Sequence, residues 1–148
     1  NVEENILSIL EKTEKSTETK QKKLEDLLAE FGIEHLRYAP SLSLSGGERR
    51  RLEIARTLAS NPKYLLLDEP LTGIDPVSIE EIKVIIKKLK NKNIGVLITD
   101  HNVRETLNIV DNVYIVNEGS IIFSGTPNEV VNNKTVKTSY LGERFKLE

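Results

Sequence analysis

The sequence predicts an α/β fold in which a helix-rich first part is followed by alternating strands and helices. Apolar residues recur at helical spacing up to residue 60, and two short apolar runs then flank a helical stretch at 76–90. Strands that alternate with helices are typical of a parallel sheet. At 148 residues we expect one domain, with a helical subdomain over 1–60 and a parallel-sheet core over 61–148.

Amphipathic helices are expected to make up most of the first part. Apolar side chains recur at helical spacing in 2–10, 24–31 and 46–60. The charged run at 11–23 carries no large apolar side chain, which indicates a solvated connection or an exposed helix face. A proline and two serines interrupt the helical pattern in 37–44, so this stretch is expected to be a loop.

The second part is predicted to begin with two buried parallel strands. Both apolar runs, Tyr64–Leu67 and Ile94–Thr99, are short and bounded by polar residues, as in strands that are covered on both faces. A short helix is expected over 103–110, and then a hairpin around Glu118-Gly119. Thr126-Pro127-Asn128-Glu129 combines an N-cap, a proline and a capping acid, which predicts the start of the last helical segment.

Composition excludes several classes of protein. The 21 basic and 23 acidic residues give no basic excess of the kind that binds nucleic acid or an anionic membrane surface. Cysteine is absent, which excludes disulfides and thiolate metal sites. No apolar run reaches the roughly 18 residues of a membrane span. Methionine is also absent and the chain starts inside a helical pattern, so we expect a C-terminal piece of a longer protein.

Ser45-Gly46-Gly47-Glu48 predicts a helix N-terminus that can bind phosphate. A capping box between Ser45 and Glu48 explains the segment in purely structural terms. Two consecutive glycines, however, cost about 1 kcal/mol each in a helix relative to alanine. Their lack of a side chain lets a phosphate approach the amides at the positive end of the helix. The arginines at 49–51 point in different directions, so they cannot all reach one ligand.

Asp68 and Glu69 close the first apolar run. Ligands of open α/β sheets bind outside the carboxyl ends of the strands, whereas the structural alternative is a pair of turn acids. We expect Asp68 to help hold Mg²⁺ through a water, and Glu69 to orient and deprotonate an attacking water. His101 follows the second run, where a neutral imidazole could contact a γ-phosphate or that water. Asp75-Pro76 is sufficiently explained as a helix N-cap.

Four motifs together resemble those of the ABC transporter ATPases. LSGGE at 44–48, YLLLDEP at 64–70, LTGIDP at 71–76 and ITDH at 98–101 are similar to that family's signature, Walker B, D-loop and switch-histidine motifs. Two features depart from the family pattern. Glu48 stands where glutamine is common, and the phosphate-binding Walker A loop, G-x-x-x-x-G-K-[ST], is absent together with the Q-loop. The resemblance implies the C-terminal part of a P-loop NTPase domain, with an incomplete RecA-like sheet.

The resemblance also implies a site shared between two subunits. In a head-to-tail homodimer, Ser45, Gly46 and Gly47 would touch the γ-phosphate of ATP that the partner binds. Glu69, Asp68 and His101 would serve the ATP and Mg²⁺ of their own subunit, and Asp75 would lie in the loop that couples the two sites. Two copies of this chain bring no Walker A loop, so the chain alone is expected to be inactive. Transmembrane permeases would be the partners, on the cytoplasmic face of the inner membrane.

A narrower resemblance concerns the transported substrate. SGGERRRLEIAR at 45–56, ITDHNVRETL at 98–107 and YLGERFKLE at 140–148 are similar to the ATPases of bacterial lipopolysaccharide export transporters. Such a subunit would power the extraction of lipopolysaccharide from the inner membrane. The ATPases of branched-chain amino-acid importers are the alternative within the family. A non-hydrolytic interaction module is the alternative outside it.

Overall fold

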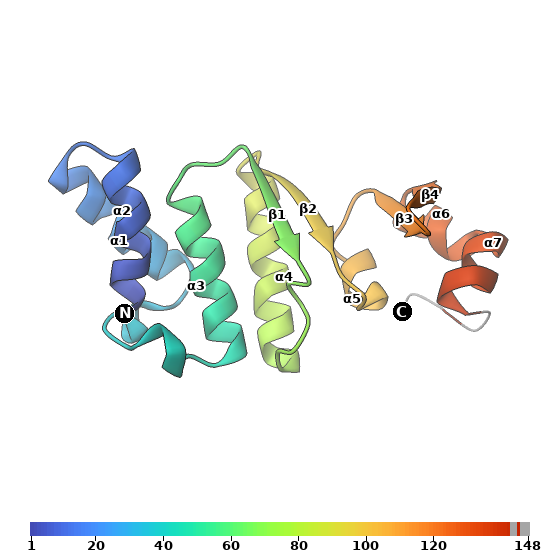
Figure 1. Cartoon of the computed structure of the whole chain (residues 1–148), viewed down its shortest axis with the longest axis horizontal. Coiled ribbons are helices and arrows are strands. Elements are labelled where there is room, and N and C mark those ends of the chain that lie inside the picture. Colours follow the sequence, from blue (N-terminus) through green and yellow to red (C-terminus); the bar gives the residue numbers. More distant parts are fainter. Residues whose placement is uncertain (143–144, 146–148) are drawn as a thin grey trace. The chain divides into compact units, whose positions relative to one another are not determined.

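The computed structural model describes residues 1–142 and 145, and divides into two compact units (Figure 1). The first unit spans Asn1–Thr99 and the second Asp100–Glu148. The division expected at residue 60 separates helical from sheet-containing sequence and stays a prediction. Of the C-terminal segment YLGERFKLE at 140–148, residues 143–144 and 146–148 lie outside the residues that the structure describes. No helix of the described residues is both long enough and apolar enough to cross a membrane.

The first unit begins with helices. They are α1 (Val2–Thr13), α2 (Thr17–Glu30), the 3-10 turns η1 (Glu34–Leu36) and η2 (Ser41–Ser43), and α3 (Gly46–Leu58). The charged run at 11–23, for which a connection was one expectation, is largely helical, because Ser16 caps α2 and begins it at Thr17. The stretch 37–44, expected to be a loop, contains the short turn η2.

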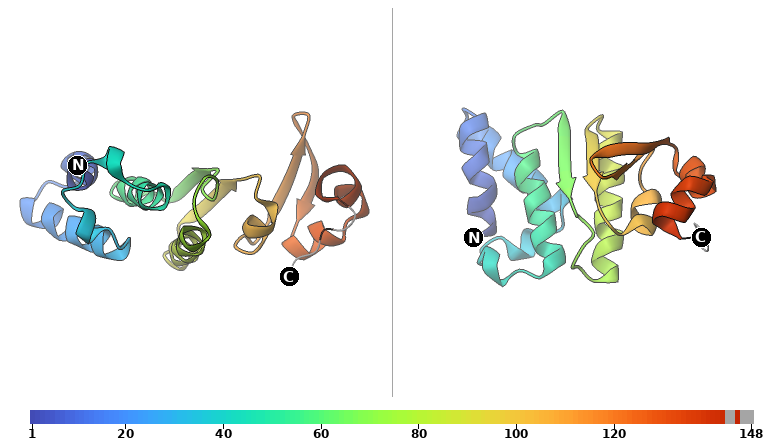
Figure 2. Two further views of the ribbon diagram at one scale, coloured as in Figure 1. Left: turned by 90° about the horizontal axis from the view of Figure 1, so that it is seen from below. Right: turned by 45° about the vertical axis from the view of Figure 1, so that its right-hand side comes forward.

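The core of the first unit lies between its helices. α3 lies between the α1–α2 pair and α4 (Pro76–Asn91), as Figures 1 and 2 show. Each helix contributes buried aliphatic side chains at the helical spacing predicted from the sequence. These include Ile6 and Leu10 on α1, Leu24 and Leu28 on α2, Leu52 and Ala55 on α3, and Ile82 and Leu89 on α4.

The two predicted strands form a parallel pair, but only one face of that pair is covered. β1 (Tyr64–Asp68) and β2 (Gly95–Thr99) run in register, with Asp68 opposite Thr99. Leu65 and Leu67 are buried, whereas the alternate side chains of β1 and β2 point to the other face. Tyr64, Leu66 and Leu97 are 76%, 71% and 56% exposed. The expectation of strands buried on both faces is therefore wrong for this chain, because α4 covers one face alone.

The second unit is built around a hairpin. Its elements are α5 (Val103–Leu107), β3 (Val113–Asn117), β4 (Ser120–Gly125), α6 (Pro127–Asn132), α7 (Lys134–Val136) and the π-helical turn η3 (Lys137–Leu141). Glu118 and Gly119 both have positive φ, at 47° and 74°, as a two-residue hairpin turn requires, so the predicted hairpin is confirmed. Thr126 and Glu129 form the predicted capping box. Leu107, Ile115, Val130 and Val136 are the buried centre of this unit.

Candidate functional site

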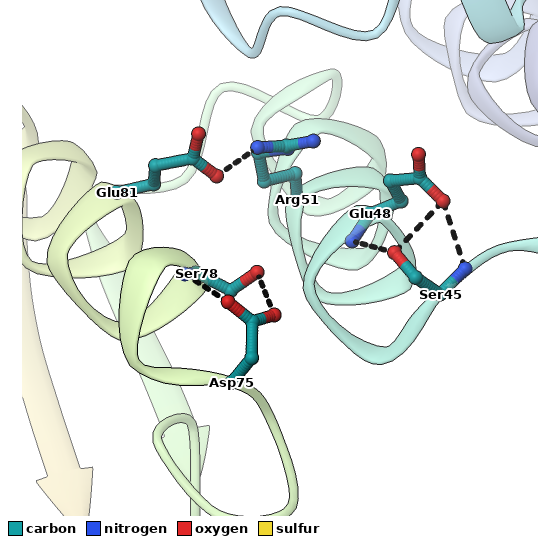
Figure 3. A network of polar contacts seen from close by, with 6 residues as sticks. All are labelled: Ser45, Glu48, Arg51, Asp75, Ser78 and Glu81. Atoms are coloured by element: carbon teal, nitrogen blue, oxygen red, sulfur yellow. Dashed lines mark hydrogen bonds and ion pairs between the residues drawn. The ribbon is translucent and has the colours of Figure 1, made fainter.

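The N-terminus of α3 is capped as its sequence predicts (Figure 3). The Ser45 hydroxyl oxygen accepts a hydrogen bond from the Glu48 amide at 3.3 Å. Glu48 Oε2 in turn accepts from the Ser45 amide and from the Ser45 hydroxyl, both at 2.8 Å. Both Ser45 donors are thus turned toward the Glu48 carboxylate. A phosphate that binds the Ser45 donors has to displace this carboxylate.

The capping box makes Glu48 sensitive to pH. The pKa of the Glu48 carboxyl is lowered, first by the hydrogen bond from the Ser45 amide and then by that from the Ser45 hydroxyl. A lowered pKa means that the cap contributes stability above the unfolded pKa of glutamate, about 4.3, and loses that contribution as pH falls through the folded value.

We therefore expect Glu48→Gln to flatten the acid side of the stability profile. Glutamine keeps a hydrogen-bonding side chain at the third helical position but does not titrate. Thermal unfolding measured from pH 6 down to about pH 3 should show a smaller loss of stability in the variant than in the parent chain. Glu53→Gln, on the same helix but outside the capping box, is the control. Equal acid slopes for Glu48→Gln and Glu53→Gln would contradict the assignment.

The two glycines of the segment lie where α3 meets α4 and the loop before it. A Cβ added to Gly46 would stand 3.1 Å from Ile74 Cγ2 and 3.2 Å from the Gly73 carbonyl oxygen. A Cβ on Gly47 would stand 2.1 Å from Ser78 Oγ and 2.6 Å from Ser78 Cβ. Real Cβ atoms do not approach that closely, so Gly47 is required by packing as well as by any ligand. The glycines therefore have a structural role that the sequence analysis did not include.

Asp75 caps α4, as its sequence predicts. Its Oδ1 accepts from the Ser78 amide at 3.0 Å and its Oδ2 accepts from the Ser78 hydroxyl at 2.6 Å (Figure 3). The same two bonds lower the pKa of the Asp75 carboxyl, that from the hydroxyl more than that from the amide. The Asp75 carboxylate is thereby held in its charged form, beside the serine that touches Gly47.

The two acids at the end of β1 lie at the carboxyl edge of the parallel pair. Asp68 Oδ1 accepts a hydrogen bond from the hydroxyl of Thr99, its partner on β2. The Glu69 amide donates to the Thr99 carbonyl oxygen at 2.7 Å. Both acids are exposed. β2 therefore anchors both residues through Thr99, and both remain exposed.

Glu69 has an unusual backbone conformation. Its φ is +46°, in the left-handed region that residues other than glycine seldom adopt, and such strain clusters at functional sites. Its carbonyl oxygen accepts from Arg50 Nη2 at 3.1 Å and from the Thr72 amide at 3.2 Å. These bonds and the Thr99 contact hold the strained conformation. Arg50 thus links the helix of the phosphate-binding segment to the backbone of the expected catalytic acid.

His101 is exposed and belongs to the second unit, two residues beyond the end of β2. Asp100 Oδ1 accepts from the Asn102 amide at 2.8 Å, and this turn leads into α5 at Val103. α5 has only five residues, so it offers His101 little of a helix dipole. The role of His101 stays a prediction.

A magnesium ion fits this edge only with help from a nucleotide and water. Among residues 1–142 and 145, no group of three or more His, Cys, Asp or Glu side chains could hold a metal ion. Mg²⁺ is often held by one or two carboxylates together with substrate phosphates and waters. The exposed Asp68 carboxylate, oriented by the Thr99 hydroxyl, suits such a site.

Sequence reasoning missed three residues that support the site. Thr99 holds Asp68 and Glu69, Arg50 holds the Glu69 carbonyl, and Ser78 joins Asp75 to Gly47. Ser78 carried a local signal, since it stands three residues after the N-cap. Thr99 could have been found from the parallel register. The partner of Arg50 is distant in sequence, and no pattern along the chain indicates it.

Comparisons with known proteins concern the family and the fold of the chain. The family model described as "ABC transporter" matches residues 1–72, and that described as "Branched-chain amino acid ATP-binding cassette transporter" matches residues 120–146. The chain is similar in structure to cbiO1 from Clostridium perfringens, part of the ABC transporter complex cbiONQ. The TM-score is 0.83 at 29% identity, over 95% of this chain and 58% of that one. The ADP conformation of MJ1267, an ATP-binding cassette of an ABC transporter, matches at a TM-score of 0.78 and 30% identity, over 96% and 63% of the two chains.

The chain belongs to the ATP-binding proteins of ABC transporters, and the predicted α/β fold of that family is confirmed. Among its relatives is the lipopolysaccharide export system ATP-binding protein of Haemophilus influenzae, 52% identical over 147 residues. Another is an ABC transporter ATP-binding protein of Rhizobium meliloti, 50% identical over 146 residues. Both alignments cover 99% of this chain, which spans 61% and 54% of the lengths of these two relatives.

Proposed function

We propose that this chain belongs to a transport ATPase in which it supplies a phosphate-contacting segment to the ATP site of a partner subunit and water-activating residues to its own ATP site. The observation that carries the proposal is the N-terminus of α3. There Ser45 caps the helix, while Gly46 packs against the loop before α4 and Gly47 packs against Ser78 of α4. A helix N-terminus with accessible amides attracts the phosphates of a nucleotide. In a head-to-tail homodimer, Ser45, Gly46 and Gly47 contact the γ-phosphate of ATP held by the partner subunit.

The residues of the sheet edge would act on the ATP of their own subunit. Mg²⁺, when bound with ATP, neutralises charge that develops on the phosphates. Asp68 would hold a water of that ion, while Glu69 would accept a proton from the attacking water. His101 contacts the γ-phosphate or the attacking water. Asp75 lies in the loop that couples the two ATP sites of the dimer. Transmembrane permeases, bound at the cytoplasmic face of the inner membrane, couple ATP hydrolysis to transport.

Lipopolysaccharide export is the transport function that we favour. Its support is the 52% identity to the Haemophilus influenzae export protein, which extends over 99% of this chain. Import of branched-chain amino acids is a second candidate, favoured by the family match at residues 120–146. A transport assay with each class of permease separates the two candidates. A non-hydrolytic interaction module would not associate with either class of permease in an ATP-dependent manner.

The shared site is tested by ATP-dependent pairing with a complete relative. The full-length Haemophilus influenzae protein is loaded with Mg·ATP, and its association with this chain is measured by analytical ultracentrifugation. Gly46→Asp should weaken the pairing by at least tenfold, since it places a carboxylate beside the phosphate and crowds Ile74. Ser60→Asp, just beyond α3, adds the same charge away from the site as a control.

Three outcomes would count against the proposal. The parent chain could pair equally well with and without ATP, Gly46→Asp could pair as tightly as the parent, or Ser60→Asp could weaken pairing as much as Gly46→Asp. The first result would favour the interaction module. The other two would remove the α3 N-terminus from the contact.

A further inference from the structure

The structure points to Arg51 and Ser78 as positioning residues, which we infer to lock the phosphate-binding end of α3 and the Asp75 loop into one mechanical unit. This inference rests on the proposed function of Ser45–Gly47 and Asp75. It adds a role for two side chains that touch no nucleotide in that proposal.

The first part of the lock is an ion pair between the two helices. An Arg51 Nη atom on α3 pairs with Glu81 Oε2 on α4, thirty residues further along the chain (Figure 3). The Arg51 side chain is 15% exposed and that of Glu81 47%, so the arginine is enclosed between the helices while the carboxylate reaches solvent. Arg51 Nε is buried without a hydrogen-bond partner. Removing Glu81 would therefore leave an enclosed guanidinium that has lost its paired carboxylate.

The second part is the close contact between Gly47 and Ser78. The Gly47 backbone approaches Ser78 so closely that a Cβ would overlap its side chain. The Ser78 hydroxyl is at the same time hydrogen-bonded to Asp75, at 2.6 Å. One serine side chain thus touches the phosphate-binding segment on one side and holds the N-cap of α4 on the other.

The two contacts are successive steps of one helix seam. Gly47 and Arg51 are four residues apart on α3, and Ser78 and Glu81 are three apart on α4, so each pair lies on one helix face. A single contact leaves two helices free to pivot about it. Two contacts a turn apart resist both sliding and rotation, because either motion breaks one of them. A shift of the Asp75 loop must then move Ser45–Gly47 with it.

Amide hydrogen exchange of this chain tests the lock directly. Glu81→Gln removes the ion pair and keeps the side-chain shape. From the modest free energy of a partly exposed ion pair, we expect exchange to rise about two- to fivefold in two segments together, 44–50 and 71–78. The double variant Arg51→Glu with Glu81→Arg restores the pair in reverse and should return exchange in both segments toward the parent. Glu80→Gln, which breaks the Lys83–Glu80 pair within α4, is the matched control and should change neither.

The pairing assay supplies the functional readout. Glu81→Gln should weaken ATP-dependent association with the full-length relative several-fold, the reversed pair should restore it, and Glu80→Gln should leave it unchanged. A rise in exchange in only one segment, in neither, or equally across the whole chain would overturn the lock. The lock would also be overturned if the parent associates with the full-length relative in an ATP-dependent manner and Glu81→Gln associates equally well. If the parent shows no ATP-dependent pairing, the proposed function fails, and the exchange data alone decide whether the lock exists.

Discussion

Replacing Glu69 with glutamine is expected to lower the rate of ATP hydrolysis by about 10²–10⁴-fold, the usual contribution of a general base. The measurement uses a chimera in which this chain replaces the matching part of the Haemophilus influenzae relative, an alignment of 147 residues at 52% identity. Glutamine keeps the size of the side chain and the backbone bonds to Thr99 and Arg50, but it cannot accept the proton of the attacking water. The turnover number should therefore fall while ATP-dependent pairing remains.

Two controls delimit this result. Glu118→Gln, at the exposed hairpin turn, makes the same chemical change away from the site and should keep the parental rate. The 148-residue chain alone, without the part of the relative that completes the chimera, should hydrolyse no Mg·ATP above background, since its sequence lacks a Walker A loop. A Glu69→Gln chimera that turns over at the parental rate would contradict the role of this acid.

Gly47→Ala is expected to destabilise the chain by about 1–3 kcal/mol, the usual cost of overpacking. The new methyl group would lie 2.1 Å from Ser78 Oγ and 2.6 Å from Ser78 Cβ, so one of the two helices has to move. Alanine is the better helix former by up to about 1 kcal/mol, which offsets part of this loss. Chemical denaturation of both chains at one temperature measures the difference in unfolding free energy.

A compensating variant makes this prediction specific. Ser78→Gly removes both overlapping atoms, so Gly47→Ala should cost much less in the Ser78→Gly background than in the parent. Gly46→Ala, whose methyl group would meet its neighbours at 3.1 and 3.2 Å, is the matched control and should cost less than Gly47→Ala. Additive effects of Gly47→Ala and Ser78→Gly would show that the contact is not the cause.

Signals that lie within a few residues of one another allowed most elements to be predicted. Ser45, Asp75 and Thr126 begin their helices as expected, because each cap is formed by side chain and backbone three residues apart. The hairpin turn at Glu118-Gly119 is equally local. The start of α2 was not identified, since its first turns are exposed and need no apolar residue for their packing.

Features that depend on contacts between distant parts of the chain could not be predicted from the sequence. An apolar strand has the same pattern whether one face or both are covered, so the exposure of Leu66 could not be read from its neighbours. The pairing of Arg51 with Glu81 depends on how α3 is placed beside α4, and the bond from Arg50 to the Glu69 carbonyl depends on how α3 is placed beside the end of β1. The type of residue at the site was predictable, whereas the contacts that hold each residue were not.

The uncovered face of the β1–β2 pair has a thermodynamic consequence. Tyr64, Leu66 and Leu97 are already hydrated in the folded chain, so unfolding exposes less new apolar surface there than in a sheet with two covered faces. The heat-capacity increment of unfolding scales with newly exposed apolar area and averages roughly 12–15 cal/mol/K per residue in globular proteins. For this chain we expect a smaller increment per residue than for a domain whose sheet is covered on both faces, and therefore a stability that varies less steeply with temperature on either side of its maximum.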